Sequence, residues 1–303
     1  MNVPGVTEEL VAKDAYAFVQ QPGGWCVSNA GLVVGDEQAL IIDTAATEAR
    51  ARAWRAAVDE RTGNHARSVI STHHHGDHTF GNHLFADTST IVSHVNGASE
   101  LRRKGLAMTS VWPGVDWGDV EATIPDTTIA TDTEFDVGGR RVDVLALGVS
   151  HTSDDLAVFD RGSGVLYVGD VAFSGSAPFV LGGSVEGSIE TLTWLQSLKP
   201  RLVVCGHGPV RGVDVLEENV AYLRYIQFLA EEAVRGTLSP LAVVELHGLG
   251  QFGYLAESER VVANVHRGIV ELNGAERGAH LDSAPIMREM VLFNGGRPLS
   301  CYA

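Results

Sequence analysis

Residues 69–83 read VISTHHHGDHTFGNH, and four histidines and one aspartate fall within six consecutive positions of this stretch. The apolar residues that open it predict a short buried strand, so the polar run lies in the loop after that strand. Neutral imidazoles and carboxylates are the ligands that zinc prefers where thiolates are absent. A solvated histidine-rich loop is the alternative interpretation, but five titratable groups directly after a buried strand are more typical of a metal site.

The spacing within this run divides its side chains into two sets. His73 and His75 alternate along the chain, so their side chains point the same way if the segment is extended. Asp77 and His78 follow the bend expected at the intervening glycine, and they can therefore face a second point nearby. The run predicts ligands for two metal ions. His74 is off this pattern, and we expect it to face solvent or to support the ligands from outside.

Three more polar residues each follow a predicted buried strand and have small neighbours. They are His151 in GVSHT, Asp170 in VGDV and His207 in CGHG. Taken singly, each has an ordinary interpretation as a cap, a turn residue or a loop histidine. Together with the run that follows residue 72, they favour one metal centre assembled at the ends of several strands.

Predicted strands and helices are mixed in both halves of the chain, which indicates a layered α/β or α+β protein. The segments LVVGDEQALIIDT and LAVFDRGSGVLYVGD share a strand–turn–strand pattern that ends in Asp43 and Asp170, and this repetition suggests two related halves. Helices are predicted over 46–60 and 212–235, and residues 97–128 are predicted to be irregular. No Pro- or Ser-rich linker interrupts the chain, so we expect a single domain.

The composition excludes several classes of partner. The 303 residues carry a net charge of −16, which argues against binding to nucleic acid or to anionic lipid. No apolar stretch reaches membrane-spanning length, and no basic start followed by an apolar run marks a secretory signal. The three cysteines, Cys26, Cys205 and Cys301, form no CxxC pair and suit a reducing compartment. We therefore expect a soluble cytoplasmic protein with neither nucleic-acid nor membrane partners.

The order of the motifs THHHGDH, GVSHT, GD at 169–170 and GHG at 206–208 resembles that of the metallo-β-lactamase superfamily. The resemblance extends over roughly residues 15–235. It implies an α+β fold, a four-layer αββα sandwich with the site along one edge and the two related halves as its two sheets. We expect residues 1–303 to form one such domain, with a helical C-terminal extension from about residue 236.

The resemblance also implies two Zn²⁺ ions as cofactors, although such ligands accept iron or manganese as well. It assigns one zinc to His73, His75 and His151. It assigns the other zinc to Asp77, His78 and His207, and it gives Asp170 the role of bridging both. Paired zinc ions lower the pKa of a shared water to ~7, which supplies hydroxide at neutral pH. Asp77 and Asp170 are the predicted catalytic residues, and Asp77 is expected to orient the nucleophile or to pass a proton to the leaving group.

Differences from the family pattern reduce the number of reactions that we expect this chain to catalyse. Asp170 stands where one class of true β-lactamases has a zinc-ligand cysteine, so the chain resembles the thioesterase, lactonase and general hydrolase branch more closely. The scattered arginines of the tail do not resemble the basic C-terminal site of hydroxyacylglutathione hydrolases. QQPGGWCVSNAG and MVLFNGGRPLSCYA resemble a group that includes bacterial aromatic-polyketide cyclases.

That last resemblance implies a dinuclear zinc hydrolase or cyclase that closes a ring in, or releases, a thioester-linked polyketide during antibiotic biosynthesis. A general ester, lactone or thioester hydrolase is the alternative of the same class. A metal-binding protein without catalysis, or an iron-containing redox member of the fold, is the alternative of another class. Metal analysis and a substrate assay distinguish these alternatives.

The irregular segment supplies candidate substrate contacts in Met108, Trp112 and Trp117. If this segment is a flap over the metals, these side chains favour a large apolar or aromatic substrate. Packing within a long loop is the equally weighted alternative. The expected partners are a small molecule or a carrier-protein-tethered thioester, for which the basic residues at 102–104 are a candidate docking patch. Exposed helices in the tail also allow a homodimer.

Overall fold

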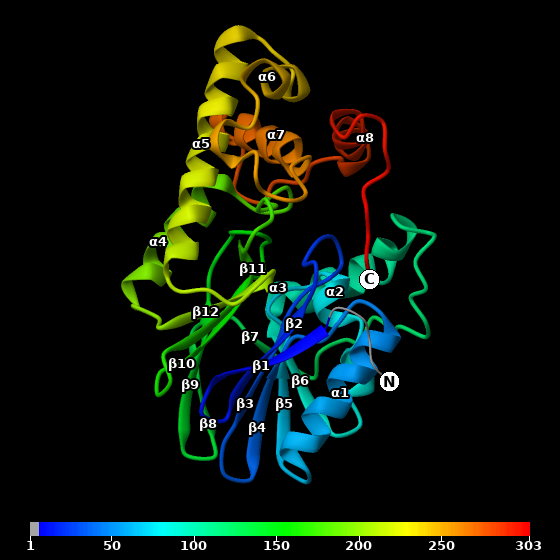
Figure 1. Ribbon diagram of the computed structural model, residues 1–303, viewed down its shortest axis with the longest axis vertical. Coiled ribbons are helices and arrows are strands. Elements are labelled where there is room, and N and C mark those ends of the chain that lie inside the picture. Colours follow the sequence, from blue (N-terminus) through cyan, green and yellow to red (C-terminus); the bar gives the residue numbers. More distant parts are fainter. Residues whose placement is uncertain (1–5) are drawn as a thin grey trace.

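The computed structural model describes residues 6–303, and its strands form two β-sheets (Figure 1). In the first sheet the strand order follows the sequence, from β1 to β7. Its strands are β1 (Val6–Ala12), β2 (Ala15–Gln20), β3 (Ala30–Val34), β4 (Gln38–Ile42), β5 (Ala66–Ile70), β6 (Ser89–His94) and β7 (Thr127–Ile129). The second sheet has the order β12-β11-β10-β9-β8, with β8 (Thr133–Val137), β9 (Arg140–Ala146), β10 (Leu156–Asp160), β11 (Val165–Phe173) and β12 (Leu202–His207). The two predicted halves of the chain therefore correspond to the two sheets.

Strand direction decides which loops share an edge. β1 to β4 form antiparallel hairpins, whereas β4, β5, β6 and β7 run parallel, so the carboxyl ends of these four strands lie at one edge. β11 and β12 also run parallel. Loops that follow parallel strands are the usual place for functional side chains in α/β sheets, because neighbouring strands deliver them to the same edge.

The apolar residues of β4 show how the layers form. Leu40 and Ile42 belong to the core between the two sheets, whereas Ala39 and Ile41 belong to the core under the outer helix. This alternation is what a strand with two buried faces requires, because successive side chains point to opposite sides. The strand is therefore sandwiched between its partner sheet and a helix layer.

Helices cover the outer face of each sheet. α1 (Glu48–Thr62) packs Trp54 and Val58 into the outer core of the first sheet, and Thr47 caps its first turn. α4 (Val185–Ser197) and α5 (Asp214–Gly236) contribute to a core shared with the second sheet. The order of layers is therefore helix, sheet, sheet, helix, which confirms the predicted αββα sandwich.

Several helices connect or follow these layers. They are α2 (Gly76–Thr79), α3 (Val95–Lys104), α6 (Pro240–His247), α7 (Arg260–Leu272) and α8 (Ser283–Phe293), with short 3₁₀ turns η1 (Asn82–Leu84), η2 (Ala107–Ser110) and η3 (Gly250–Phe252). Within residues 6–303, no helix is both long and apolar enough to cross a bilayer. The assignment of residues 1–303 to a single domain stays a prediction, and its first five residues lie outside the described part.

The prediction of irregular structure over 97–128 is wrong at its two ends. Its first eight residues belong to α3, and its last two belong to β7. α3 has only ten residues, and Asn96 and Gly97 in its first turn are poor helix formers, so the segment does not stand out as a helix from residue preference. The His94 side chain accepts a hydrogen bond from the Asn96 amide and starts the helix.

Candidate metal centre

Strand ends bring the predicted ligands to one edge of the sandwich. The histidine-rich run follows β5 and continues into α2, and the loop between β9 and β10 carries His151. Asp170 lies in β11, and His207 is the last residue of β12. All seven predicted ligands meet there in two groups of metal-binding atoms, although the ligand role of each residue stays a prediction.

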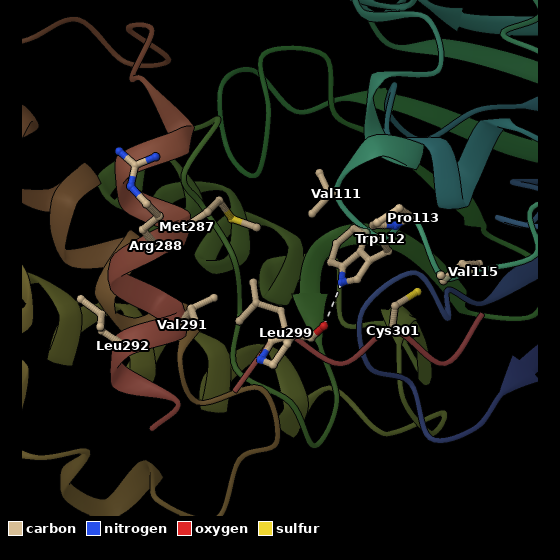
Figure 2. A pocket seen from close by; sticks show the side chains of 12 residues that line it. Val111, Trp112, Pro113, Val115, Met287, Arg288, Val291, Leu292, Leu299 and Cys301 are labelled. Carbon is tan, nitrogen blue, oxygen red and sulfur yellow. Dashed lines mark hydrogen bonds between the residues drawn. The ribbon is translucent and has the colours of Figure 1, made fainter. Parts of the chain in front are cut away.

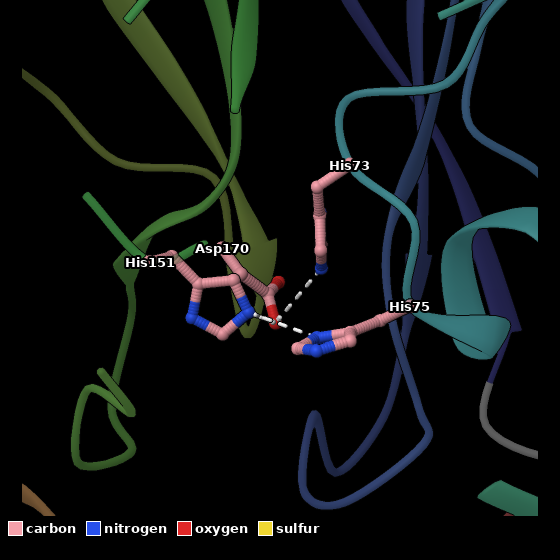
Figure 3. A group of neighbouring side chains, drawn as sticks. All are labelled: His73, His75, His151 and Asp170. Atoms are coloured by element: carbon pink, nitrogen blue, oxygen red, sulfur yellow. Dashed lines mark hydrogen bonds and ion pairs between the residues drawn. The ribbon is translucent and has the colours of Figure 1, made fainter. Parts of the chain in front are cut away.

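The first group, here called the three-histidine group, consists of His73, His75 and His151, and it adjoins Asp170. Their candidate ligand atoms all lie within 4.8 Å of one another. His151 Nε2 lies 3.0 Å from His75 Nδ1, and Figure 3 shows the three rings directed toward the Asp170 carboxylate. Two imidazole nitrogens this close share at most one proton, which leaves room for a cation to coordinate both.

The second group, here called the mixed group, consists of Asp77, His78 and His207, also with ligand atoms within 4.8 Å of one another. Asp77 Oδ2 lies 3.4 Å from His207 Nε2 and 3.8 Å from His78 Nε2. All three residues are buried. A carboxylate and two imidazoles are a ligand set that suits zinc, iron or manganese.

Asp170 lies between the two groups, and its two oxygens face different sides. Oδ1 is 3.1 Å from His78 Nε2 and 3.3 Å from His207 Nε2. Oδ2 is 3.5 Å from His151 Nε2 and 4.0 Å from His73 Nε2. This arrangement is the one that a carboxylate bridging two metal ions would need.

Backbone carbonyls fix two of the histidine rings. His207 Nδ1 donates to the Val27 carbonyl at 3.0 Å, and His151 Nδ1 donates to the Phe179 carbonyl. Because a carbonyl only accepts, each contact places the proton on Nδ1 and leaves Nε2 free to face Asp170. Contacts of this kind orient metal-binding histidines in known sites.

Asp43 orients a third ring, although it is not among the site residues predicted from the sequence. It is buried directly after β4, and its Oδ2 accepts from His78 Nδ1 at 2.7 Å. The amide and hydroxyl of Thr72 also donate to Asp43, each at 2.7 Å. The repeated strand–turn–strand pattern that ends in Asp43 and Asp170 is the sequence signal that could have identified it.

Two glycines allow the close packing around Asp170. A Cβ at Gly206 would lie 1.9 Å from Asp170 Oδ1, so any side chain there would displace the carboxylate. Gly169 has a φ of +51°, and a Cβ there would lie 2.5 Å from Thr72 Oγ1. The glycines of the GD and GHG motifs are therefore required by the geometry of the site.

The two groups differ in how they hold protons. Burial, followed by repulsion from neighbouring histidines, lowers the pKa values of His73 and His75 well below the usual range, and burial also lowers the pKa of His151. In the mixed group burial also lowers the pKa values of the histidines, but the negative charges of the nearby carboxylates, chiefly Asp170, together raise them by more. The pKa of His207 is raised to about 9, and that of His78 is raised well above its usual value.

The donor atoms fit a bound cation. His73 Nε2, His78 Nε2 and Asp170 Oδ1 are buried and make no hydrogen bond. Buried polar atoms are nearly always partnered in folded proteins, so three unpartnered ligand atoms in one cluster are best explained by metal coordination. The residues present therefore fit a metal ion at each group.

His74 does not face solvent, so that part of the expectation is wrong. It is buried, and its Nδ1 lies 2.8 Å from Asp154 Oδ1. On the other side, its Nε2 accepts a hydrogen bond from Lys104 Nζ at 2.7 Å. The reason is that α3, in a segment predicted to be irregular, places Lys104 against the loop. Lys104 also pairs with Glu100 at 3.2 Å, so it is not a free member of the basic patch.

Trp112 lies near the centre without entering it. Its indole donates to the Leu299 carbonyl at 3.0 Å, and its ring packs on that of Trp25 at 5.6 Å. Trp25 meets the ring of Phe179 edge-on at 5.0 Å, and the Phe179 carbonyl holds His151. Aromatic side chains therefore connect the predicted flap with the three-histidine group.

The other two predicted substrate contacts are held more locally. Trp117 donates from its indole to the Trp112 carbonyl at 3.3 Å and packs edge-on against Phe80. Met108 is partly buried against the core of the second sheet and its helices. Whether Met108, Trp112 and Trp117 contact a substrate stays a prediction.

Part of the chain is similar in sequence to curated proteins. Among curated proteins, the hydroxyacylglutathione hydrolase of Prochlorococcus marinus (strain MIT 9301) is 26% identical over 178 residues, which are 58% of this chain and 63% of that protein. The hydroxyacylglutathione hydrolase of Chromohalobacter salexigens is 29% identical over 172 residues, which are 55% of this chain and 54% of that protein. The match thus spans little more than half the length of these relatives.

Solved structures show the same fold. The metallo-β-lactamase from Pontibacter korlensis aligns with a TM-score of 0.59 and 18% identity, over 72% of this chain and 99% of that one. The DIM-1 metallo-β-lactamase aligns with a TM-score of 0.60 and 17% identity, over 74% of this chain and 99% of that one. The family model described as the metallo-beta-lactamase superfamily matches residues 23–207, which contain both ligand groups and Asp170. The chain therefore belongs to the metallo-β-lactamase superfamily.

Proposed function

We propose that this protein is a dinuclear zinc-dependent thioesterase whose substrate is a bulky acyl thioester, such as a thioester-linked polyketide. The observation that carries the proposal is the pair of buried ligand groups with the Asp170 carboxylate between them. A hydroxyacylglutathione is itself a thioester, so the names of the curated relatives support the reaction class. In a polyketide substrate, release from the thiol is expected to accompany ring closure.

Two zinc ions held by these groups would supply Lewis acidity and a nucleophilic hydroxide at neutral pH. The chain's own residues hold and orient what reacts. Hydrolysis transfers the oxygen of water to the acyl carbon, breaks the carbon–sulfur bond and leaves one proton for the thiolate. We assign the handling of that proton to Asp77, whose carboxylate lies beside His207 at the centre.

The walls near the centre support a large acyl group. Trp25, Trp112 and Phe179 form a continuous aromatic layer behind His151. Aromatic walls with few polar groups are typical of sites that bind large apolar ligands. Trp112→Ala should therefore weaken the use of a bulky acyl substrate and spare a small one, whereas equal effects on both would indicate loop packing.

The partner that presents the substrate is part of the same proposal. A free small molecule or a thioester tethered to an acidic carrier protein would both reach a site at the sandwich edge. Arg102 and Arg103 are exposed on α3, and Arg103 also pairs with Glu100 at 2.6 Å, whereas Lys104 is engaged with both Glu100 and His74. These two arginines are the residues that a carrier protein would contact.

The test is thioester cleavage by the purified, zinc-loaded protein. Acetyl N-acetylcysteamine and a bulky β-polyketo or aromatic acyl N-acetylcysteamine are offered in parallel, with and without a chelator. Released thiol is followed, the carbon product is examined for a new ring, and bound metal is measured. Chelator-sensitive cleavage that favours the bulky acyl group supports the proposal. Cleavage of neither thioester removes it and directs the search to lactones and simple esters.

A further inference from the structure

A cavity of about 730 Å³ lies between residues 111–115 and α8, and it contains none of the predicted metal ligands (Figure 2). Trp112 and Val111 line one side, and Met287 and Val291 of α8 line the other. The family match ends at residue 207, so the α8 wall lies beyond it. The cavity is therefore a feature for which the superfamily match supplies no role.

The size and lining of the cavity suit a small apolar molecule. Binding sites for such molecules commonly have volumes of about 300–1,000 Å³ and mostly apolar walls. Figure 2 shows Met287 and Val291 projecting from α8 toward the side that carries Trp112 and Leu299. The hydrogen bond from the Trp112 indole to the Leu299 carbonyl, 3.0 Å long, holds this wall in place before any ligand arrives.

One lining residue is charged, and its charge is unpaired. Arg288 is exposed on α8, and no residue of the described range 6–303 forms an ion pair or hydrogen bond with its guanidinium. The chain as a whole carries a net charge of −16, and Arg288 is the one charged residue among the described residues that line the cavity. A guanidinium pairs favourably with a carboxylate and loses less hydration than an ammonium would.

The inner wall of the cavity leads toward the metal centre. Cys301 lines the cavity and pairs with Trp25 in a short parallel β-bridge. The Trp25 ring packs on Trp112 at 5.6 Å and on Phe179 at 5.0 Å. The Phe179 carbonyl in turn holds His151, so one aromatic layer separates the cavity from the three-histidine group.

We propose that this cavity binds a ring-sized apolar group that carries an anionic substituent, with Arg288 pairing with the anion. The inference goes beyond the proposed function: an aromatic layer lies between the cavity and His151, so the bound group is a ligand distinct from the acyl group that would react at the metal centre. The unpaired charge of Arg288 favours an anion over a neutral lipid.

Binding of 2-naphthoate to the full chain tests the inference without any catalytic step. Isothermal titration calorimetry compares the native protein with V291W, which fills the cavity, and with V234W, a matched control at an exposed position of α5. We expect V291W to weaken binding by at least about tenfold and V234W to leave it unchanged. Unchanged binding by V291W, with native circular dichroism, would overturn the proposed location.

The charge is tested separately with a neutral probe of the same size. R288Q should weaken 2-naphthoate binding about tenfold, the loss expected for one charged hydrogen-bonded contact, and leave 2-naphthalenemethanol binding unchanged. An equal loss for both probes would contradict the role of Arg288. Because R288Q changes an exposed side chain, the variant is expected to fold normally.

The outcomes distinguish this inference from the proposed function. Binding of 2-naphthoate that depends on the cavity, without cleavage of any thioester, would remove the thioesterase proposal and leave the binding site. Thioester cleavage without 2-naphthoate binding would leave the enzyme and remove the site. A dimer by sedimentation that V291W dissociates would show that a second copy of the chain covers the cavity, and this result would also overturn the inference.

Discussion

The three-histidine group and the mixed group hold similar ligands but opposite protonation. In the three-histidine group, burial and mutual repulsion keep the imidazoles neutral, with lowered pKa values. In the mixed group, the Asp170 and Asp77 carboxylates favour the charged form, and the pKa of His207 is about 9. A residue must be deprotonated to bind a metal ion. The three-histidine group is already neutral, whereas the mixed group must first lose a proton.

This difference identifies Asp170 as the residue whose replacement has the largest effect. Its Oδ1 faces the mixed group and its Oδ2 faces the three-histidine group. We expect D170N to reduce turnover on the order of 100- to 1000-fold, because one charge that stabilises both groups is lost. Metal content should fall mainly in the mixed group, measured by inductively coupled plasma mass spectrometry.

E121Q, at an exposed carboxylate away from the ligands, is the matched control for D170N and should retain full turnover and metal. Circular dichroism should show that D170N keeps its fold. Full activity of D170N with both metals bound would disprove the bridging role.

Removal of one histidine from each group tests whether the groups act separately. H151A should lose the metal of the three-histidine group and keep the other, and H207A should do the reverse. Each variant is expected to retain about one metal per chain and to lose turnover about 100-fold. If either variant loses both metals, the groups depend on one another and the comparison between them fails.

The pH dependence of metal affinity follows from the same difference. Below pH 9 the metal-free protein binds a proton at His207, and a metal ion must displace it. Apparent affinity at the mixed group should therefore fall about tenfold per pH unit per displaced proton from pH 8 to pH 6. The three-histidine group, with lowered pKa values, should change little over that range. Competition with a chromophoric chelator measures both affinities, and equal slopes would contradict the assignment.

The residues that meet at the centre were recognisable from the sequence because they lie in or after predicted strands: four follow β5, and His207 ends β12. Asp170 was expected after a strand but lies within β11, because this strand continues to Phe173. His151, Asp170 and His207 are recognisable from an apolar run that ends in a polar residue with small neighbours. The β-hairpins and a layered α/β or α+β architecture were predicted from the same strand patterns, whereas the resemblance to the metallo-β-lactamase superfamily implied the αββα layers. What strand ends cannot reveal is which nitrogen of each ring faces inward, because carbonyls such as that of Val27 come from distant segments.

The contacts of His74 show a second limit of sequence reasoning. Its neighbours Asp154 and Lys104 are 80 and 30 residues away along the chain. Local pattern carries no information about such pairs, so it left open whether His74 faces solvent or supports the ligands from outside. The cavity beside α8 was not predictable for the same reason, because Trp112 and Leu299 are distant in the sequence and meet only through tertiary packing.

Asp43 should have a smaller effect than any ligand, because it acts through His78. D43N keeps a similar shape but loses the negative charge that holds the His78 Nδ1 proton. We expect metal affinity at the mixed group to fall about 10- to 100-fold, the usual loss when the partner of a metal-binding histidine is removed. D43A should lose more than D43N, whereas a loss confined to the three-histidine group would contradict this role.

Lys104 provides the smallest and most discriminating comparison, because it acts only beside the three-histidine group. Its ammonium donates to His74, and its charge is one of the causes that lower the pKa of His75. K104M keeps the length of the side chain but removes the charge, so the pKa of His75 should rise and metal affinity should fall only a few-fold at acidic pH. Above neutral pH the variant should match the native protein, since His75 is then neutral in both. R102M, two residues away on another face of α3 and without a hydrogen bond to His74, is the control, and an equal loss in K104M and R102M would show that general surface charge is responsible.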